Sequence, residues 1–328
     1  MTKKRILSGM RPTGKLHLGH LVGALDNWVK LQQECECFFM VADWHALMSE
    51  YSRPSDIQIN ILDNVADWIS CGINSKKSTI FIQSEVKEHL ELYMILSCLV
   101  PLGWLERCPT YKEQLKELDK KDINTYGFLG YPVLQAADIL LYKADGVPVG
   151  EDQLPHLELT REIGRRFNHL YKDVFKDPQA ILTQVPRLFG LDGRKMSKSY
   201  GNTLNLSDTE KSIREKVGMM FTDPKRIKFT DPGHPKECNV YSYYNVFSSS
   251  ITDEVFNWCT NSTVGCTECK KRLADILLKK LFPIQEKREE LLKEKSTIKK
   301  ILKEGAEKAS EVASSTLGEV KKAMGLYV

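Results

Sequence analysis

Two histidines and three glycines lie close together near the start of the chain, in the stretch SGMRPTGKLHLGH at residues 8–20. The stretch follows a short apolar run and precedes a helical pattern, and such a junction binds ligands in α/β sheets. Backbone N–H groups at a helix start attract phosphate. Gly19 leaves room for a flat ring, and His17 and His20 can donate hydrogen bonds to phosphate oxygens. The stretch therefore predicts a nucleotide site. Zinc is disfavoured because no cysteine or acidic residue lies nearby at ligand spacing.

A second stretch of this kind is DGRKMSKSYG at residues 192–201, in which two lysines and two serines lie between glycines. Such a loop is cationic, and it can close over a triphosphate. Lys195 and Lys198 would then contact the outer phosphates as compact point charges. Taken alone, however, the stretch is more readily interpreted as a basic surface loop.

Four of the nine cysteines, Cys238, Cys259, Cys266 and Cys269, follow the spacing C-x20-C-x6-C-x2-C. Four thiolates can close a tetrahedral zinc site or hold a [4Fe–4S] cluster, and spacing alone does not separate the two. The odd number of cysteines argues against a closed disulfide framework. We therefore expect a metal site in the second half of the chain.

Short apolar runs alternate with helical patterns over the first 190 residues. This alternation predicts an α/β fold, a Rossmann-like parallel sheet with crossover helices. The expected strands are Arg5–Ser8, Cys37–Ala42, Thr79–Gln83 and Val147–Gly150. The expected helices of this half include residues 21–31, 57–69, 92–99 and 133–142.

The second half reads as a C-terminal α-helical domain, with helices expected at 210–221, 254–258, 268–281 and 283–324. Residues 270–303 hold 12 Lys or Arg against 5 Asp or Glu, a local excess that suits a polyanionic partner or a solvated helix face. The chain has 42% hydrophobic residues, lacks a run long enough to span a bilayer and does not begin like a secretory signal. We expect a cytoplasmic protein with no membrane partner.

The HxGH pattern at 17–20 and the complete KMSKS at 195–199 together resemble the class I aminoacyl-tRNA synthetases. The segment YPVLQAADILLY at 131–142, VPVGEDQ at 147–153 and HLELTR at 156–161 are similar to the tryptophanyl-tRNA synthetases in particular. The resemblance implies activation of L-tryptophan with ATP and its transfer to the 3′ adenosine of tRNA(Trp). It further implies Mg²⁺ at the phosphates and a homodimer. The expected domains are a catalytic domain at 1–200 and an anticodon-binding domain at 201–328, whose final helix could pack back on the first.

The resemblance also assigns roles by position. Asp138 would accept the indole N–H, Val147 and Val149 would line the indole pocket, and Tyr131 would help to hold the amino group. The catalytic residues would be His17, His20, Lys195 and Lys198. The ATP-binding residues would be Arg11, Thr13, Gly19, His20, Gly150, Asp152, Lys195, Met196, Ser197 and Lys198. The substrate-binding residues would be Tyr131, Gln135, Asp138, Val147, Val149, Gln153 and His45, although His45 could equally be a core histidine.

Some bacterial tryptophanyl-tRNA synthetases carry an iron–sulfur cluster in the helical domain, and the four-cysteine pattern looks similar. This favours [4Fe–4S] over Zn²⁺. Two residues depart from the common family pattern: Gln135 replaces an apolar residue, and Arg11 replaces a glutamine. The alternatives are a tyrosine-specific relative, a small-molecule nucleotidyltransferase and a tRNA-binding paralogue without catalysis.

Overall fold

The computed structural model describes residues 3–109, 124–182 and 188–327. The chain forms two compact units. Unit 1 comprises Met1–Gly14, Asn27–Thr183 and Leu291–Val328, and unit 2 comprises Lys15–Asp26 and Gln184–Glu290. The domains expected at 1–200 and 201–328 stay a prediction.

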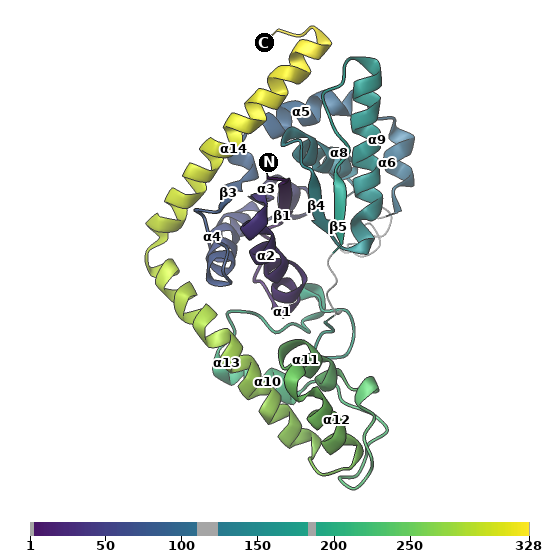
Figure 1. Cartoon of the computed structure of the whole chain (residues 1–328), viewed down its shortest axis with the longest axis vertical. Coiled ribbons are helices and arrows are strands. Elements are labelled where there is room, and N and C mark those ends of the chain that lie inside the picture. The colour runs from purple at the N-terminus through teal and green to yellow at the C-terminus, as the bar shows by residue number, and fades with distance from the viewer. Residues whose placement is uncertain (1–2, 110–123, 183–187, 328) are drawn as a thin grey trace. The chain divides into compact units, whose positions relative to one another are not determined.

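Unit 1 is built on one parallel sheet of five strands, which confirms the predicted fold class (Figure 1). The strands are β1 (Arg5–Met10), β2 (Glu36–Val41), β3 (Ser78–Ile82), β4 (Gly146–Val149) and β5 (Gln179–Leu182). Their order is β3-β2-β1-β4-β5, so the chain changes direction across the sheet between β1 and β4. Ligands bind at such switch points, beyond the carboxyl ends of the strands.

Helices cover the sheet of unit 1, and their apolar faces form its core. They include α2 (Asp26–Glu34), α3 (Asp43–Glu50), α4 (Pro54–Ser70), α5 (Glu88–Ser97), α6 (Leu102–Arg107), α8 (Tyr126–Leu141) and α9 (Leu154–Leu170). Trp28 stacks on Phe39 of β2 at 4.4 Å between ring centroids and meets Trp68 of α4 edge-on. Twelve of the 16 residues of α8 are buried, because this helix packs against both α5 and α9.

The last helix, α14 (Lys295–Met324), runs along the edge strand β3 (Figure 1). Gly305 allows this close approach, because an added Cβ would overlap the backbone carbonyl of Ile80. The predicted helix at 283–324 is wrong at its start. Pro283 lies inside α13 (Cys266–Lys293), and the break falls at Glu294. A proline removes only one helical hydrogen bond, and here the helix continues through it.

Unit 2 is mainly helical. It contains α1 (Leu18–His20), a π-helical turn (Leu21–Leu25), α10 (Glu210–Gly218), α11 (Asn239–Phe247), α12 (Thr252–Thr260) and most of α13. Ile213, Val217, Tyr243, Tyr244 and Leu277 are fully buried in it. In the part of the chain that the structure describes, no helix is both long and apolar enough to cross a membrane.

Candidate active site

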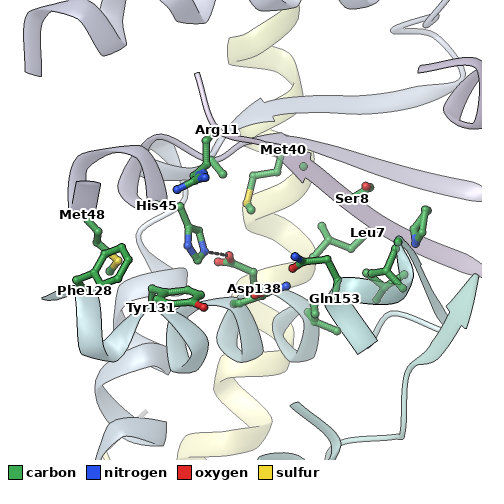
Figure 2. Close-up of a pocket in the computed structure, with 18 residues that line it drawn as sticks. Leu7, Ser8, Arg11, Met40, His45, Met48, Phe128, Tyr131, Asp138 and Gln153 are labelled. Atoms are coloured by element: carbon green, nitrogen blue, oxygen red, sulfur yellow. Dashed lines mark hydrogen bonds and ion pairs between the residues drawn. The ribbon is translucent and has the colours of Figure 1, made fainter. Parts of the chain in front are cut away.

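A cavity of about 360 Å³ opens at the switch point of the sheet in unit 1 (Figure 2). This volume lies within the usual range for small-molecule sites. β1 contributes Leu7, Ser8 and Gly9 to its wall, and the end of β4 contributes Val147, Pro148 and Val149. The other walls are Arg11, Met40, Ala42, His45, Met48, Phe128, Tyr131, Gln135, Asp138, Ile139, Gly150 and Gln153.

Helix α8 supplies the polar wall of this pocket. Tyr131, Gln135 and Asp138 follow one another at helical spacing, so their side chains share one face of the helix. Nine residues expected from the sequence line the cavity. They are Arg11, His45, Tyr131, Gln135, Asp138, Val147, Val149, Gly150 and Gln153. Thr13 and Asp152 belong to the same unit but lie outside the pocket lining.

Asp138 is the buried polar centre of the pocket, with 2% of its surface exposed. Its Oδ2 lies 2.8 Å from Nε2 of His45, which points toward it in Figure 2. Its Oδ1 lies 2.6 Å from Nδ1 of His89 and accepts a hydrogen bond from Gln83 at 2.8 Å. Burial alone would raise the pKa of Asp138, but the hydrogen bonds and charges of His45 and His89 lower it below its ordinary value. The pocket therefore presents an ionised carboxylate.

Tyr131, at another point of the pocket wall, is held by a buried histidine. Its hydroxyl lies 2.9 Å from Nε2 of His156, and Nδ1 of His156 lies 3.6 Å from Sγ of Cys108. Burial and the charge of His45 lower the pKa of His156 to about 4. His156 is therefore neutral near pH 7.

This histidine makes stability depend on pH. An unfolded histidine binds a proton near pH 6.5, whereas folded His156 does so near pH 4. The stability it contributes is complete above pH 6.5 and is lost as pH falls from 6.5 to 4, by about 3 kcal/mol. We expect the difference in unfolding free energy between the wild type and His156→Gln to shrink by about this amount over that range, measured by urea denaturation. A difference that does not change with pH would contradict this assignment.

In unit 2 the structure brings the histidine and lysine stretches together. Leu18 N–H donates to the Leu204 carbonyl, and Leu206 N–H donates to the Leu16 carbonyl, both at 2.9 Å. His17 also forms an antiparallel bridge with Asn205. Burial, and next the charge of Lys198, lower the pKa of His17 to about 4. The imidazole and the ammonium thus belong to one electrostatic site.

His20 has the ring tautomer in which Nε2 is the hydrogen-bond donor. Its Nδ1 accepts the backbone N–H of His17 at 3.2 Å, and burial with the charges of His17 and Lys198 lowers its pKa well below the ordinary value. A neutral ring with a bare Nδ1 carries its hydrogen on Nε2. A glycine at position 19 leaves room for the His17 ring, because an added Cβ would lie only 2.9 Å from Nδ1 of His17.

Asn202 holds the lysine loop. Its Oδ1 accepts the backbone N–H of Ser197 at 2.9 Å, and its Nδ2 donates to the Lys195 carbonyl at 3.1 Å and to Asp192 at 2.8 Å. Met196 is buried, and an added Cβ on Gly19 would lie 3.5 Å from its sulfur. The backbone of the loop is therefore anchored beside the histidines, while the Lys195 side chain is exposed.

The comparisons with known proteins agree with this arrangement. Residues 2–282 match the family model described as tRNA synthetases class I (W and Y). The tryptophan–tRNA ligase of Thermotoga maritima is 54% identical over 98% of this chain and 99% of its own length. The chain belongs to the tryptophanyl-tRNA synthetases. The enzyme of Aquifex aeolicus, 43% identical over 98% of this chain and all of its own, gives the same family.

Solved structures agree. The tryptophanyl-tRNA synthetase of Campylobacter jejuni, solved with ADP and tryptophan, has a TM-score of 0.90 and 34% identity. The match covers 98% of this chain and all of the other. A tyrosyl-tRNA synthetase of Archaeoglobus fulgidus has a TM-score of 0.68 at 20% identity, which shows a shared fold.

The four cysteines of the expected metal site all lie in unit 2 of this synthetase, and each of these four is a thiol that forms no disulfide. Burial, together with the charges of the nearby thiols Cys238, Cys259 and Cys266, raises the pKa of the Cys269 thiol to about 12. The four sulfurs are thus neighbours. Within residues 3–109, 124–182 and 188–327, however, no group of three or more His, Cys, Asp or Glu side chains is arranged to hold a metal ion. The structure therefore does not show the predicted [4Fe–4S] site, although the four neighbouring thiols have suitable donor chemistry.

Sequence reasoning missed several site residues of this synthetase. His89, Gln83 and Tyr142 surround Asp138 behind the pocket wall, and His156 holds Tyr131. Tyr142 carried a usable signal, because it follows Asp138 by four residues and caps the C-terminus of the same helix. His89 carried none, since 49 residues separate it from Asp138.

Proposed function

We propose that this chain activates L-tryptophan with ATP to form tryptophanyl-adenylate and transfers the tryptophanyl group to the 3′ adenosine of tRNA(Trp). The observation that carries the proposal is the switch-point pocket with a buried, ionised carboxylate on its wall. Full-length relatives named tryptophan–tRNA ligase support it. Within unit 2, the histidines and lysines that lie near one another supply the groups that a phosphate reaction needs.

The pocket suits a flat apolar side chain with one donor. Val147 and Val149 would contact the indole ring, and Asp138 would accept its N–H. Tyr131 and Gln153 would contact the amino group. Gln135 and Arg11 add polar groups where the family commonly has an apolar residue and a glutamine. Both line this cavity, so they would touch substrate and not solvent alone.

Activation forms a bond between a carboxylate oxygen of tryptophan and the α-phosphorus of ATP, and it breaks the bond from that phosphorus to the pyrophosphate oxygen. The carboxylate is already ionised, so no general base is required. Catalysis then depends on positioning and on stabilising charge at phosphorus. His20 would donate from Nε2, and Lys195 and Lys198 would hold the outer phosphates. Mg²⁺ would bind chiefly through phosphate and water oxygens, as it commonly does with nucleotides.

The second step is transfer of the tryptophanyl group from the adenylate to the tRNA. The terminal ribose hydroxyl of the tRNA attacks the carbonyl carbon of the adenylate, and AMP leaves. Family membership implies the 2′-hydroxyl as the first acceptor.

The deciding experiment is ATP–pyrophosphate exchange with each of the 20 amino acids, followed by charging of tRNA. We expect exchange with tryptophan only. Exchange with tyrosine and not tryptophan would make the chain a tyrosine-specific relative. No exchange with any amino acid would revive the non-catalytic tRNA-binding paralogue, and exchange without charging would favour a nucleotidyltransferase.

We also propose that the helical region 201–328 binds the anticodon part of the tRNA. Its support is the basic excess at residues 270–303. Lys270, Lys271 and Arg272 begin this segment. Arg272 lies over the ring of Trp258 at 4.9 Å, which fixes its guanidinium on the surface of unit 2.

Two copies are proposed to associate through an apolar face of unit 1. Leu90 and Met94 of α5, Leu102 of α6 and Tyr126 of α8 are exposed by 38%, 62%, 62% and 73%. We expect Met94→Glu to lower the mass in sedimentation from twice 37.5 kDa to 37.5 kDa, because it buries an unpaired charge in the interface. Leu170→Glu, a matched change at an exposed leucine of α9, should leave the dimer intact. A Met94→Glu dimer would refute the choice of face.

We propose finally that Cys238, Cys259, Cys266 and Cys269 hold a [4Fe–4S] cluster with a structural role, supported by the mutual proximity of the thiols. Anaerobically purified protein should be brown and contain about four iron atoms per chain. Cys269→Ala should lose the iron, whereas Cys98→Ala, a change at an exposed cysteine of unit 1, should keep it. A colourless protein with stoichiometric zinc would contradict the cluster and leave the thiolate site.

A further inference from the structure

The two oxygens of Asp138 face different surroundings. Oδ2 pairs with His45, which lines the pocket. Oδ1 takes its two partners, Gln83 and His89, from behind the pocket wall, and both of these side chains are completely buried. The carboxylate therefore has an inner oxygen fixed by the protein and an outer oxygen at the cavity.

His89 connects this inner oxygen to a second buried group. Its Nδ1 lies 2.6 Å from Oδ1 of Asp138, and its Nε2 lies 2.8 Å from the hydroxyl of Tyr142. A carboxylate can only accept, so Nδ1 must carry the hydrogen. In a neutral ring the phenol then donates to Nε2. Burial raises the pKa of Tyr142 well above its ordinary value, so the phenol keeps that hydrogen.

A count of acceptor sites shows what is left for a substrate. An ionised carboxylate offers about four lone-pair directions. Within the described residues Asp138 has three partners, two on Oδ1 and one on Oδ2. One acceptor direction therefore remains, on the oxygen that faces the cavity. A group that donates one hydrogen bond satisfies it, whereas a ring atom that only accepts would repel it.

We propose that His89 is a specificity-determining positioning residue, which anchors the inner oxygen of Asp138 so that the outer oxygen is held as an acceptor for the indole N–H. This inference rests on the proposed activation of tryptophan. His89 does not line the pocket and acts only through Asp138. A core histidine that merely satisfies its own polar atoms would instead give equal losses for every substrate when it is replaced.

The test compares L-tryptophan with 3-benzothienyl-L-alanine, in which sulfur replaces the indole N–H and the ring keeps its shape. Both are assayed by ATP–pyrophosphate exchange with His89→Asn and His89→Gln. The amide nitrogen of asparagine can take the place of Nδ1, whereas that of glutamine takes the place of Nε2. The two variants thus make similar cavities but differ in the bond to Asp138.

We expect His89→Gln to lower kcat/KM for tryptophan by about 30-fold and to change that for the benzothienyl analogue by less than about 3-fold. His89→Asn should keep the ratio of the two substrates within about 3-fold of the wild type. Tyr142→Phe, which leaves the bond to Asp138 but frees Nε2, should give an intermediate ratio.

Equal losses for the two substrates in both variants, or an unchanged ratio in His89→Gln, would overturn the proposal. If His89→Gln does not fold, the ratio of kcat/KM for the two substrates in Tyr142→Phe decides. A wild-type ratio in that variant would overturn the proposed positioning of Asp138 through His89. Failure of the wild-type chain to activate tryptophan would instead overturn the proposed function, so the two failures are distinguishable.

Discussion

Replacement of Asp138 by asparagine is expected to lower kcat/KM for tryptophan in ATP–pyrophosphate exchange by about 10³-fold. The side chains have the same shape, so the effect arises from hydrogen bonding. Gln83 and His89 donate hydrogen bonds to the inner oxygen, Oδ1, of Asp138. In the variant they favour the orientation in which the amide oxygen of asparagine takes that place. The amide nitrogen then faces the cavity, where it meets the indole N–H donor to donor. In the opposite orientation the amide nitrogen instead faces the two donors Gln83 and His89.

Asp173→Asn is the matched control, since it makes the same chemical change at an exposed aspartate of unit 1. Its exchange rate should stay within about 2-fold of the wild type. Thermal unfolding of both variants separates binding from stability. A folded Asp138→Asn protein that activates tryptophan at the wild-type rate would remove Asp138 from substrate recognition.

The parallel sheet of unit 1 could be predicted from the sequence because buried strands give continuous apolar runs, as in Cys37–Ala42. β5 escaped this reasoning. Its apolar run at residues 180–182 is only three residues long, shorter than the run expected of a buried strand. Likewise, Pro283 suggested a helix start, but the tertiary packing of α13 outweighs the single lost hydrogen bond.

The candidate site likewise contains some residues that the sequence could predict and others that it could not. Residues on one helix, such as Tyr131, Gln135 and Asp138, have a spacing that by itself places their side chains on a common face. Contacts between distant segments have no such signal. His45 is 93 residues from Asp138 in sequence, and only the fold makes it a partner. This is why the sequence left the role of His45 open while the structure places it on the pocket wall.

The lysine loop of unit 2 leads to the second large effect. Lys195→Ala should lower kcat of tryptophan-dependent exchange by about 10²- to 10³-fold, with little change in KM for tryptophan. Asn202 holds the backbone at residues 195 and 197, so the substitution removes a charge and leaves the loop in place.

Arg194→Ala provides the control within the same loop. The Arg194 guanidinium is engaged by Asp192 at 2.7 Å and lies over the Tyr200 ring at 5.1 Å, so it is turned toward the protein surface. Arg194→Ala should lower kcat of tryptophan-dependent exchange by less than about 3-fold, since exposed ion pairs contribute little. If Lys195→Ala and Arg194→Ala lose activity equally, the loss arises from a changed loop conformation and not from the missing charge of Lys195. If neither does, the charge of Lys195 does not stabilise the transferring phosphate, and the phosphate-binding role of the loop must pass to other residues.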